Sequence, residues 1–207
     1  MAEAGAWRDA PLAQRAVKRA LDFLVALAGL IVLLPLLLVI AMAIRRDSAG
    51  PVLFRQVREG FRLSRFTILK FRTMVDRGGG GFAQARPRDP RVTTVGAYLR
   101  AASLDELPQL LNVLGGSLSL VGPRPHVPEL SARFAPLIEG YYERLAVRPG
   151  ITGLAQVNGL RGETETLARM AARIRYDRAY ARGWTVGGDI AICVATLRSP
   201  LRQERAY

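Results

Sequence analysis

The longest apolar stretch of the chain runs from Phe23 to Ile44 without a charged residue, and Pro35 divides it. Its length is close to the roughly 20 residues that a helix needs to cross a bilayer. The arms on either side of Pro35 measure only about 18 and 13 Å at helical rise, so neither crosses alone. Two interpretations therefore stay open: a spanning helix, or a helix bent at Pro35 that enters and leaves by one face. Basic residues at both ends favour no orientation: Arg15, Lys18, Arg19, Arg45 and Arg46.

The residues that flank the apolar stretch indicate whether it is a cleaved signal peptide. The stretch ends in Arg45-Arg46-Asp47 rather than in a small-residue cleavage site, which argues against a cleaved signal peptide. Residues 1–14 show no regular pattern, so we expect them to be loosely ordered. A membrane segment over residues 15–47, followed by one domain over 48–207, is the expected organisation.

The pattern after the apolar stretch predicts a β-hairpin. Residues 51–57 and 66–72 are strand-like and flank a turn around Glu59-Gly60. Lys70 and Arg72 lie two residues apart and so project on one face, either as a solvated edge or as a binding surface. Four consecutive glycines, residues 78–81, predict a flexible loop.

The second half of the chain is dominated by helical patterns, which makes the expected fold α+β and mostly helical. Leucines at 104, 107, 111 and 114 recur at helical spacing, and Gly115-Gly116 ends that helix. Further elements are predicted over four ranges: an amphipathic helix over 127–147, a short strand over 154–158, a basic helix over 164–181 and a short apolar helix over 189–197. The charges of the basic helix are typical of a solvated face.

Two adjacent carboxylates, Asp105 and Glu106, begin the leucine-rich helix of a protein whose formal charge is +13. Ser103 and Glu106 fit a capping box, and acidic residues favour a first helical turn. Pro108 removes a helical hydrogen bond, so the regular helix is expected to begin there and to leave both carboxylates in a preceding turn. Backbone N–H groups at such a turn also bind phosphates, so capping and catalysis are compatible.

Composition narrows the chemistry. A single cysteine, Cys193, excludes an internal disulfide and fits a reducing compartment. With His126 the only histidine, a His/Cys zinc cage is excluded, and a catalytic metal would be a hard cation held by oxygen, Mg²⁺ first. The basic surface suits nucleic acid, anionic lipid or a phosphorylated substrate.

Prolines on both sides of Arg124 fix its backbone, either to present the guanidinium or to form a rigid turn.

The order of these features resembles the bacterial sugar transferase family, the small monotopic phosphoglycosyl transferases. The resemblance covers about residues 15 to 200 and rests on the Pro-broken apolar helix and on these segments: Gly50-Pro51-Val52, Lys70-Phe71-Arg72-Thr73-Met74, Ser103 to Leu114, Ser119 to Pro125 and Arg148 to Asn158. It implies a re-entrant N-terminal helix, amphipathic interfacial helices and a catalytic domain on the cytoplasmic face of the bacterial inner membrane. Two positions depart from the family pattern: Leu34 stands where serine is common, and Ser117 where an aspartate is frequent.

The resemblance also implies a reaction and a set of site residues. A UDP-sugar gives its phosphosugar to undecaprenyl phosphate, and UMP leaves; a homodimer is left open and nucleic acid is not expected as a partner. Asp105 matches the nucleophile that forms an aspartyl-phosphosugar, and Glu106 matches a second acid that supports it through metal binding or proton handling. Both are expected to hold Mg²⁺ or Mn²⁺. Phosphate binding is expected from Arg124, with Lys70, Arg72, Arg100 and Arg148 as weaker candidates.

Two other classes of protein remain as rivals. A non-enzymatic membrane-anchored basic protein, binding anionic lipid or nucleic acid, explains the charge and the apolar stretch but not the pair Asp105 and Glu106. A glycosyltransferase that moves sugar without phosphate would release UDP instead of UMP, so the identity of the product separates that case.

Overall fold

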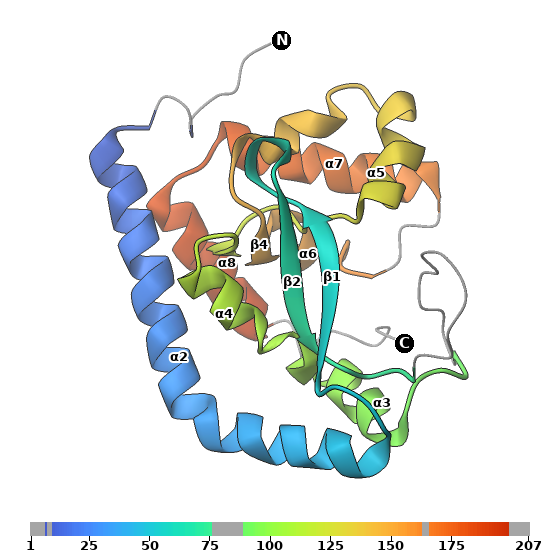
Figure 1. Cartoon of the computed structure of the whole chain (residues 1–207). Coiled ribbons are helices and arrows are strands. Elements are labelled where there is room, and N and C mark those ends of the chain that lie inside the picture. Colours follow the sequence, from blue (N-terminus) through green and yellow to red (C-terminus); the bar gives the residue numbers. More distant parts are fainter. Residues whose placement is uncertain (1–6, 8–9, 76–88, 163–165, 199–207) are drawn as a thin grey trace.

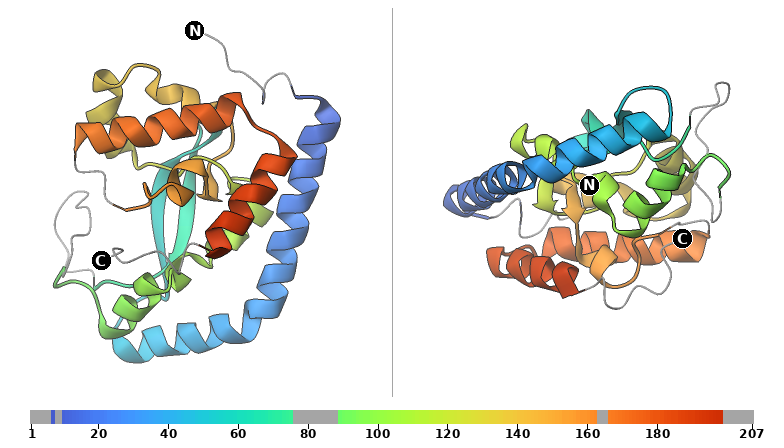
Figure 2. Two further views of the ribbon diagram at one scale, coloured as in Figure 1. Left: turned by 180° about the vertical axis from the view of Figure 1, so that it is seen from behind. Right: turned by 90° about the horizontal axis from the view of Figure 1, so that it is seen from below.

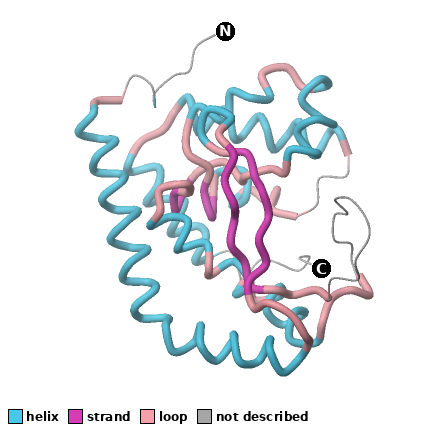
Figure 3. Tube along the Cα trace, in the orientation of Figure 1, coloured by secondary structure: helices cyan, strands magenta, loops and turns pink. Residues whose placement is uncertain are grey.

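The structure is a computed structural model that describes residues 7, 10–75, 89–162 and 166–198 of the 207-residue chain. The described part is mostly helical and contains the expected hairpin, together with a second two-stranded sheet that was not expected (Figure 1; Figure 3). The loop predicted over residues 78–81 lies outside the described residues. The helices and strands are α2 (Leu12–Asp47), β1 (Leu53–Glu59), β2 (Arg65–Phe71), α3 (Thr94–Ala101), α4 (Gln109–Leu114), β3 (Ser119–Val121), α5 (Pro128–Phe134), β4 (Gly150–Thr152), α6 (Leu154–Val157), α7 (Leu167–Arg182) and α8 (Val186–Arg198).

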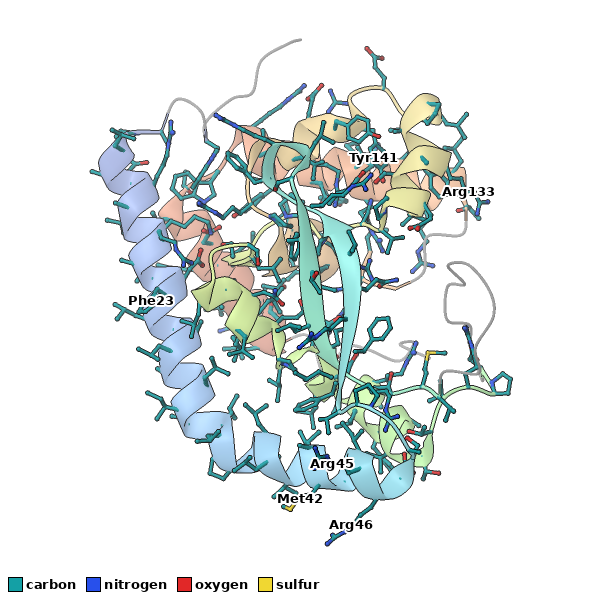
Figure 4. The ribbon with its side chains drawn as sticks, viewed as in Figure 1. Phe23, Met42, Arg45, Arg46, Arg133 and Tyr141 are labelled. Atoms are coloured by element: carbon teal, nitrogen blue, oxygen red, sulfur yellow. The ribbon has the colours of Figure 1, made fainter. Side chains whose placement is uncertain are left out.

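Helix α2 is long and bent. It contains Pro35, and it runs down one side of the domain before it turns across the bottom (Figure 1). It is the one described helix long and apolar enough to cross a membrane, and most of its apolar window is exposed. Phe23 on the first arm and Met42 on the second are both about half exposed (Figure 4). The bend follows from the hydrogen bond and the space that a proline denies to a helix.

Both arms of α2 are fixed to the same domain. On the first arm, Asp22 accepts hydrogen bonds from the Ser119 hydroxyl at 2.7 Å and from the Leu120 N–H at 3.0 Å. On the second arm, Ile40 and Ile44 are buried in a cluster with Phe71 and Leu99. Since both ends of the helix pack on one body, its elbow and the outer surface of the elbow face away from the domain (Figure 2).

The N-terminal residues that the structure describes also touch the core. Trp7 and Ala10 are buried within the segment expected to be loosely ordered, and Trp7 packs edge-on against Trp184 at 4.8 Å between ring centroids. Helix α8 lies beside the first arm of α2, where Lys18 Nζ and Asp189 Oδ2 are 2.6 Å apart. Lys18 is buried at this contact.

The predicted hairpin is present. Strands β1 and β2 pair antiparallel from Leu53 opposite Phe71 to Glu59 opposite Arg65. The connection is longer than a tight turn and includes a 3₁₀ turn, Phe61–Leu63. Asn112 of α4 receives the Leu69 N–H at 2.9 Å and donates to the Thr67 carbonyl at 2.8 Å, so its amide satisfies the free edge of β2. The acidic turn is thereby held against the hairpin.

The second sheet corrects one sequence prediction. The strand expected over residues 154–158 is wrong: Leu154–Val157 forms α6, and the strand is β4, immediately before it. Strand β4 pairs in parallel with β3, with Ser119 opposite Gly150 and Val121 opposite Thr152.

The helix predicted over residues 127–147 is broken into α5 and two 3₁₀ turns, and Gly140, at φ 69°, lies between the two turns. The basic helix and the short apolar helix are confirmed as α7 and α8.

Candidate active site

The acidic pair lies in a 3₁₀ turn, Leu104–Glu106, directly before α4. Helix α4 begins after Pro108, so the prediction that Pro108 leaves both carboxylates in a preceding turn is confirmed. The capping box is wrong. Ser103 has φ 57°, in the left-handed region, and its side chain makes no capping hydrogen bond. The turn is therefore shaped by backbone conformation and by contacts of Glu106 rather than by a serine cap.

Glu106 is buried and surrounded by cations. Its Oε1 atom accepts hydrogen bonds from Lys70 Nζ and Arg124 Nη2, both at 2.8 Å. Its Oε2 atom lies 3.6 Å from Arg161 Nη2 and has no hydrogen-bond partner among the described residues. Burial alone would raise the pKa of Glu106, but the charges of Arg124 and Lys70 outweigh it and hold the pKa well below its ordinary value. Glu106 is therefore ionised at neutral pH and anchors the cations around it.

Asp105 is in the opposite situation. Its side chain is half-buried, and within the described part of the chain it forms no ion pair and accepts no hydrogen bond. Burial raises the pKa of Asp105, and the charge of Glu106 adds to the rise, against the opposing charges of Lys70, Arg124 and Arg100. An ionised carboxylate with unoccupied lone pairs beside several cations is suited to act as a nucleophile or a metal ligand.

More positive charge surrounds the pair than the acids can balance. Arg58 of β1 donates to the Pro125 carbonyl at 3.2 Å, and burial, together with the charge of Arg124, lowers its pKa to about 10. Burial lowers the pKa of Lys70 too, although Glu106 opposes that shift. Desolvated cations that repel one another favour an anionic ligand. Phosphate is the anion that arginine forks match best.

Strands β3 and β4 set the backbone of the Arg124 segment. The Gly122 N–H donates to the Thr152 carbonyl at 2.9 Å, and the Gly150 N–H donates to the Pro123 carbonyl at 3.0 Å. The two glycines approach so closely that a Cβ on Gly150 would lie 2.1 Å from the Gly122 nitrogen. Any side chain at Gly150 would therefore displace the loop that presents Arg124.

The structure brings together some of the expected phosphate-binding residues and separates others. Lys70 and Arg124 meet at Glu106, and Arg100 lies close enough for its charge to act on Asp105. Arg72 is placed elsewhere: it lies just beyond β2 and donates to the carbonyls of Ser48 and Ala49, at the end of α2. Arg148 donates to the Gly116 carbonyl at 3.1 Å and stands over the Phe61 ring. Neither Arg72 nor Arg148 contacts the two carboxylates.

Two residues of the cluster, Arg161 and Arg58, were not among the predicted site residues. Arg161 follows a run of loop residues and no local pattern points to it. Arg58 occupies one of the cationic strand positions of the predicted hairpin, so the sequence placed it on a strand without indicating that it turns inward. Only the tertiary arrangement brings them to Glu106 and Arg124.

The donor set fits a hard cation with few protein ligands. Among the described residues no three acidic, histidine or cysteine side chains gather to hold a metal. Within the described residues, Glu106 Oε2 is buried without a hydrogen-bond partner and the Asp105 carboxylate is unpaired, so adjacent residues offer two oxygen donors. Mg²⁺ is commonly held by one or two carboxylates together with substrate phosphates, so the residues present fit Mg²⁺ provided that the substrate supplies the remaining oxygens.

Comparisons with known proteins identify the family of the chain. The family model described as bacterial sugar transferase matches residues 13–203. The chain is 48% identical over 191 residues to a UDP-glucose:undecaprenyl-phosphate glucose-1-phosphate transferase of Klebsiella pneumoniae, covering 92% of this chain and 41% of that protein. A protein of the same name from Caulobacter vibrioides is 50% identical over 191 residues, with 92% and 72% covered. The exopolysaccharide production protein PSS of Rhizobium leguminosarum is 43% identical over 196 residues, with 92% and 98% covered. The chain thus spans less than half the length of the Klebsiella relative.

Proposed function

Because the chain belongs to the bacterial sugar transferase family, we propose that it is a phosphoglycosyl transferase acting on a UDP-sugar and undecaprenyl phosphate. It moves the sugar-1-phosphate to the lipid and releases UMP. UDP-glucose is the first donor to test, since the Klebsiella and Caulobacter relatives are named for it. The observation that carries the proposal is that a cation-bound Glu106 stands next to Asp105, which pairs with none of the described residues, in a region of excess positive charge.

The reaction has two displacements at one phosphorus. A carboxylate oxygen of Asp105 attacks the phosphate that bears the sugar, and the bond from that phosphorus to the bridging oxygen breaks, so that UMP leaves with that oxygen. The phosphate oxygen of undecaprenyl phosphate then attacks the same phosphorus and displaces the Asp105 carboxylate. No proton moves in either step, because the nucleophiles and leaving groups are anions. The barrier is therefore chiefly electrostatic repulsion between anions.

The residues around Asp105 reduce that repulsion. Lys70 and Arg124 are fixed by Glu106, so their charges are already oriented where a diphosphate would bind. Glu106 serves as the anchor of these cations; its low pKa argues against a role in proton handling. Asp105 and Glu106 Oε2 would hold Mg²⁺, which supplies charge neutralisation for the diphosphate when bound.

We also propose that α2 is re-entrant and that the protein is monotopic on the cytoplasmic face of the inner membrane. Two observations support this. Both arms of α2 are attached to one domain, the first through Asp22 and Ser119 and the second through Ile44 and Phe71. A helix that crossed the bilayer would have to release one of these attachments. Exposed apolar residues on α8, which lies beside the first arm, would contact the same lipid surface: Ile190, Val194 and Leu197.

The test is formation of the covalent intermediate. Purified protein is incubated with labelled UDP-glucose and Mg²⁺ but no lipid acceptor. A phosphosugar adduct should appear at Asp105 by mass spectrometry, with UMP released in step with it, and undecaprenyl phosphate should then discharge the adduct into lipid. Release of UDP would instead identify a glycosyltransferase that moves sugar without phosphate. Adduct formation by an Asp105→Asn variant of an active enzyme would sink the assignment of the nucleophile.

A further inference from the structure

Of the three described cations that form ion pairs with Glu106, two stand on loops rather than on regular elements. Arg124 lies between β3 and α5, and Arg161 lies between α6 and α7. A long guanidinium side chain on a loop contributes a fixed charge only if its own backbone is held in place. The source of that rigidity is helix α7, which runs past both loops.

Arg173 of α7 holds the loop of Arg161. Its Nε and Nη2 atoms donate to the Leu160 carbonyl at 3.0 and 2.7 Å, and Nη2 also donates to the Gly162 carbonyl at 2.6 Å. These carbonyls belong to the residues on either side of Arg161. A single guanidinium therefore clamps the backbone immediately before and after the residue whose side chain reaches Glu106.

Asp177 of α7 holds the loop of Arg124 through one intermediary. Its Oδ2 atom accepts a hydrogen bond from Arg144 Nε at 2.9 Å. Arg144, which is fully buried, donates through Nη2 to the backbone carbonyl of Arg124. Asp177 thus orients Arg144, and Arg144 fixes the backbone of the residue that contacts Glu106 Oε1.

Arg173 and Asp177 are four residues apart, so they share one buried face of α7. Placing charges there is costly: burial lowers the pKa of Arg173 to about 9, and nearby Arg124 adds to that shift. Well-packed apolar residues would fill the same volume without this cost. Their hydrogen bonds converge on the two loop arginines of the site.

We propose that Arg173 and Asp177 are positioning residues of the active site. Arg173 sets the backbone of Arg161 directly, and Asp177 sets that of Arg124 through Arg144, so that both guanidinium groups stand ready around Glu106 and the incoming diphosphate. The inference rests on the proposed function, because it assigns these residues to the site of that reaction.

The test is a pair of mutant cycles. Arg173→Lys keeps the charge but lacks the fork that bonds two carbonyls, and it is combined with Arg161→Ala. In the second cycle Arg144→Met and Asp177→Leu are introduced together, which removes both partners of the buried pair and so need not unfold the protein; this pair is combined with Arg124→Ala. For each variant kcat, KM, the dissociation constant of UDP and the melting temperature are measured.

If the residues act through the loop arginines, Arg173→Lys should reduce kcat/KM and UDP affinity by about tenfold or more in the wild-type background. In the Arg161→Ala background the same change should cost little, because the arginine it positions is gone. The second cycle should behave in the same way with Arg124→Ala. Arg178→Lys is the matched control: Arg178 stands on the same helix, is partly exposed and pairs with Glu143 rather than with the loops of Arg124 and Arg161, so kcat/KM should be unchanged.

In both cycles, losses of kcat/KM and UDP affinity that are additive and run parallel to the fall in melting temperature would overturn the inference. The network would then have only a packing role. An enzyme that binds UDP but transfers no phosphosugar would count against the proposed function alone, and the UDP cycles would still decide the positioning. Absence of UDP binding by the wild-type protein would reject both.

Discussion

Asp105 and Glu106 are consecutive residues whose carboxyl groups have pKa values displaced in opposite directions. The pKa of Glu106 lies well below its ordinary value because Arg124 and Lys70 outweigh the effect of burial, whereas burial raises that of Asp105. Two titratable side chains whose surroundings shift their pKa values in opposite directions commonly have different roles in an active site. Glu106 organises the cations, and Asp105 remains available to react.

The first prediction follows from the cost of keeping Asp105 charged. Burial raises the pKa of Asp105 in the folded protein, so the ionised side chain lowers the free energy of unfolding at neutral pH. Asp105→Asn removes that charge and should abolish transfer while raising the melting temperature or leaving it unchanged. Differential scanning calorimetry and a UMP-release assay on the same preparation check both effects. A variant that lost activity through unfolding would show a lowered melting temperature instead.

The second prediction concerns pH. Transfer requires ionised Asp105, so the rate should fall as pH drops through the raised pKa of this residue, that is, at a pH above the ordinary range of an aspartate. Glu106 stays ionised throughout that range because its pKa is lowered. The measurement is kcat/KM against pH at constant ionic strength. If kcat/KM instead fell only at the ordinary pKa of an aspartate, the result would argue against a half-buried nucleophile.

The sequence predicted the acidic turn because the signal is local: two carboxylates, then a proline, then leucines at helical spacing. It predicted the hairpin for the same reason. It missed the parallel pair of β3 and β4, because each strand has three residues and the pairing joins segments about 30 residues apart. It misplaced Ser103 as a cap, because side-chain pattern does not reveal a left-handed backbone. Arg161 was missed because its partner, Glu106, is distant in sequence.

The third prediction separates Arg124, the main phosphate-binding candidate from the sequence, from Arg72, one of the weaker candidates. Arg124 contacts Glu106, while Arg72 caps the end of α2 through main-chain carbonyls. Arg124→Lys should weaken UDP-sugar binding and slow transfer, because lysine cannot reproduce a guanidinium fork on phosphate. Arg72→Lys should cost about 1 kcal/mol of stability and leave KM unchanged. Steady-state kinetics and denaturant unfolding of both variants check these effects. A raised KM in the Arg72→Lys variant would instead indicate that Arg72 binds the phosphates of the substrate.

The fourth prediction concerns the metal. With only Asp105 and Glu106 as acidic donors in the described site, the free enzyme should bind Mg²⁺ weakly, and binding should tighten when a diphosphate supplies further oxygens. Mg²⁺ alone should therefore shift the melting temperature little, and Mg²⁺ with UDP should shift it more than the sum of the separate shifts. EDTA should stop transfer, and Mg²⁺ or Mn²⁺ should restore it. Undiminished turnover in EDTA would remove the metal from the reaction.

The last prediction concerns the path of α2. Its two ends carry basic residues and both are attached to the catalytic domain, the first arm by Arg19 on the carbonyls of Val113 and Leu114 and the second by Arg72. A bent helix keeps both ends in the cytoplasm. Single cysteines replacing exposed Ala13 and exposed Arg46, in a Cys193→Ser background, should both resist a membrane-impermeant thiol reagent in intact cells and react after lysis. Labelling of one position alone in intact cells would establish a spanning helix. Pro35→Leu restores the hydrogen bond that the proline withholds and should shift α2 towards that spanning form, at the expense of the contacts made by one arm.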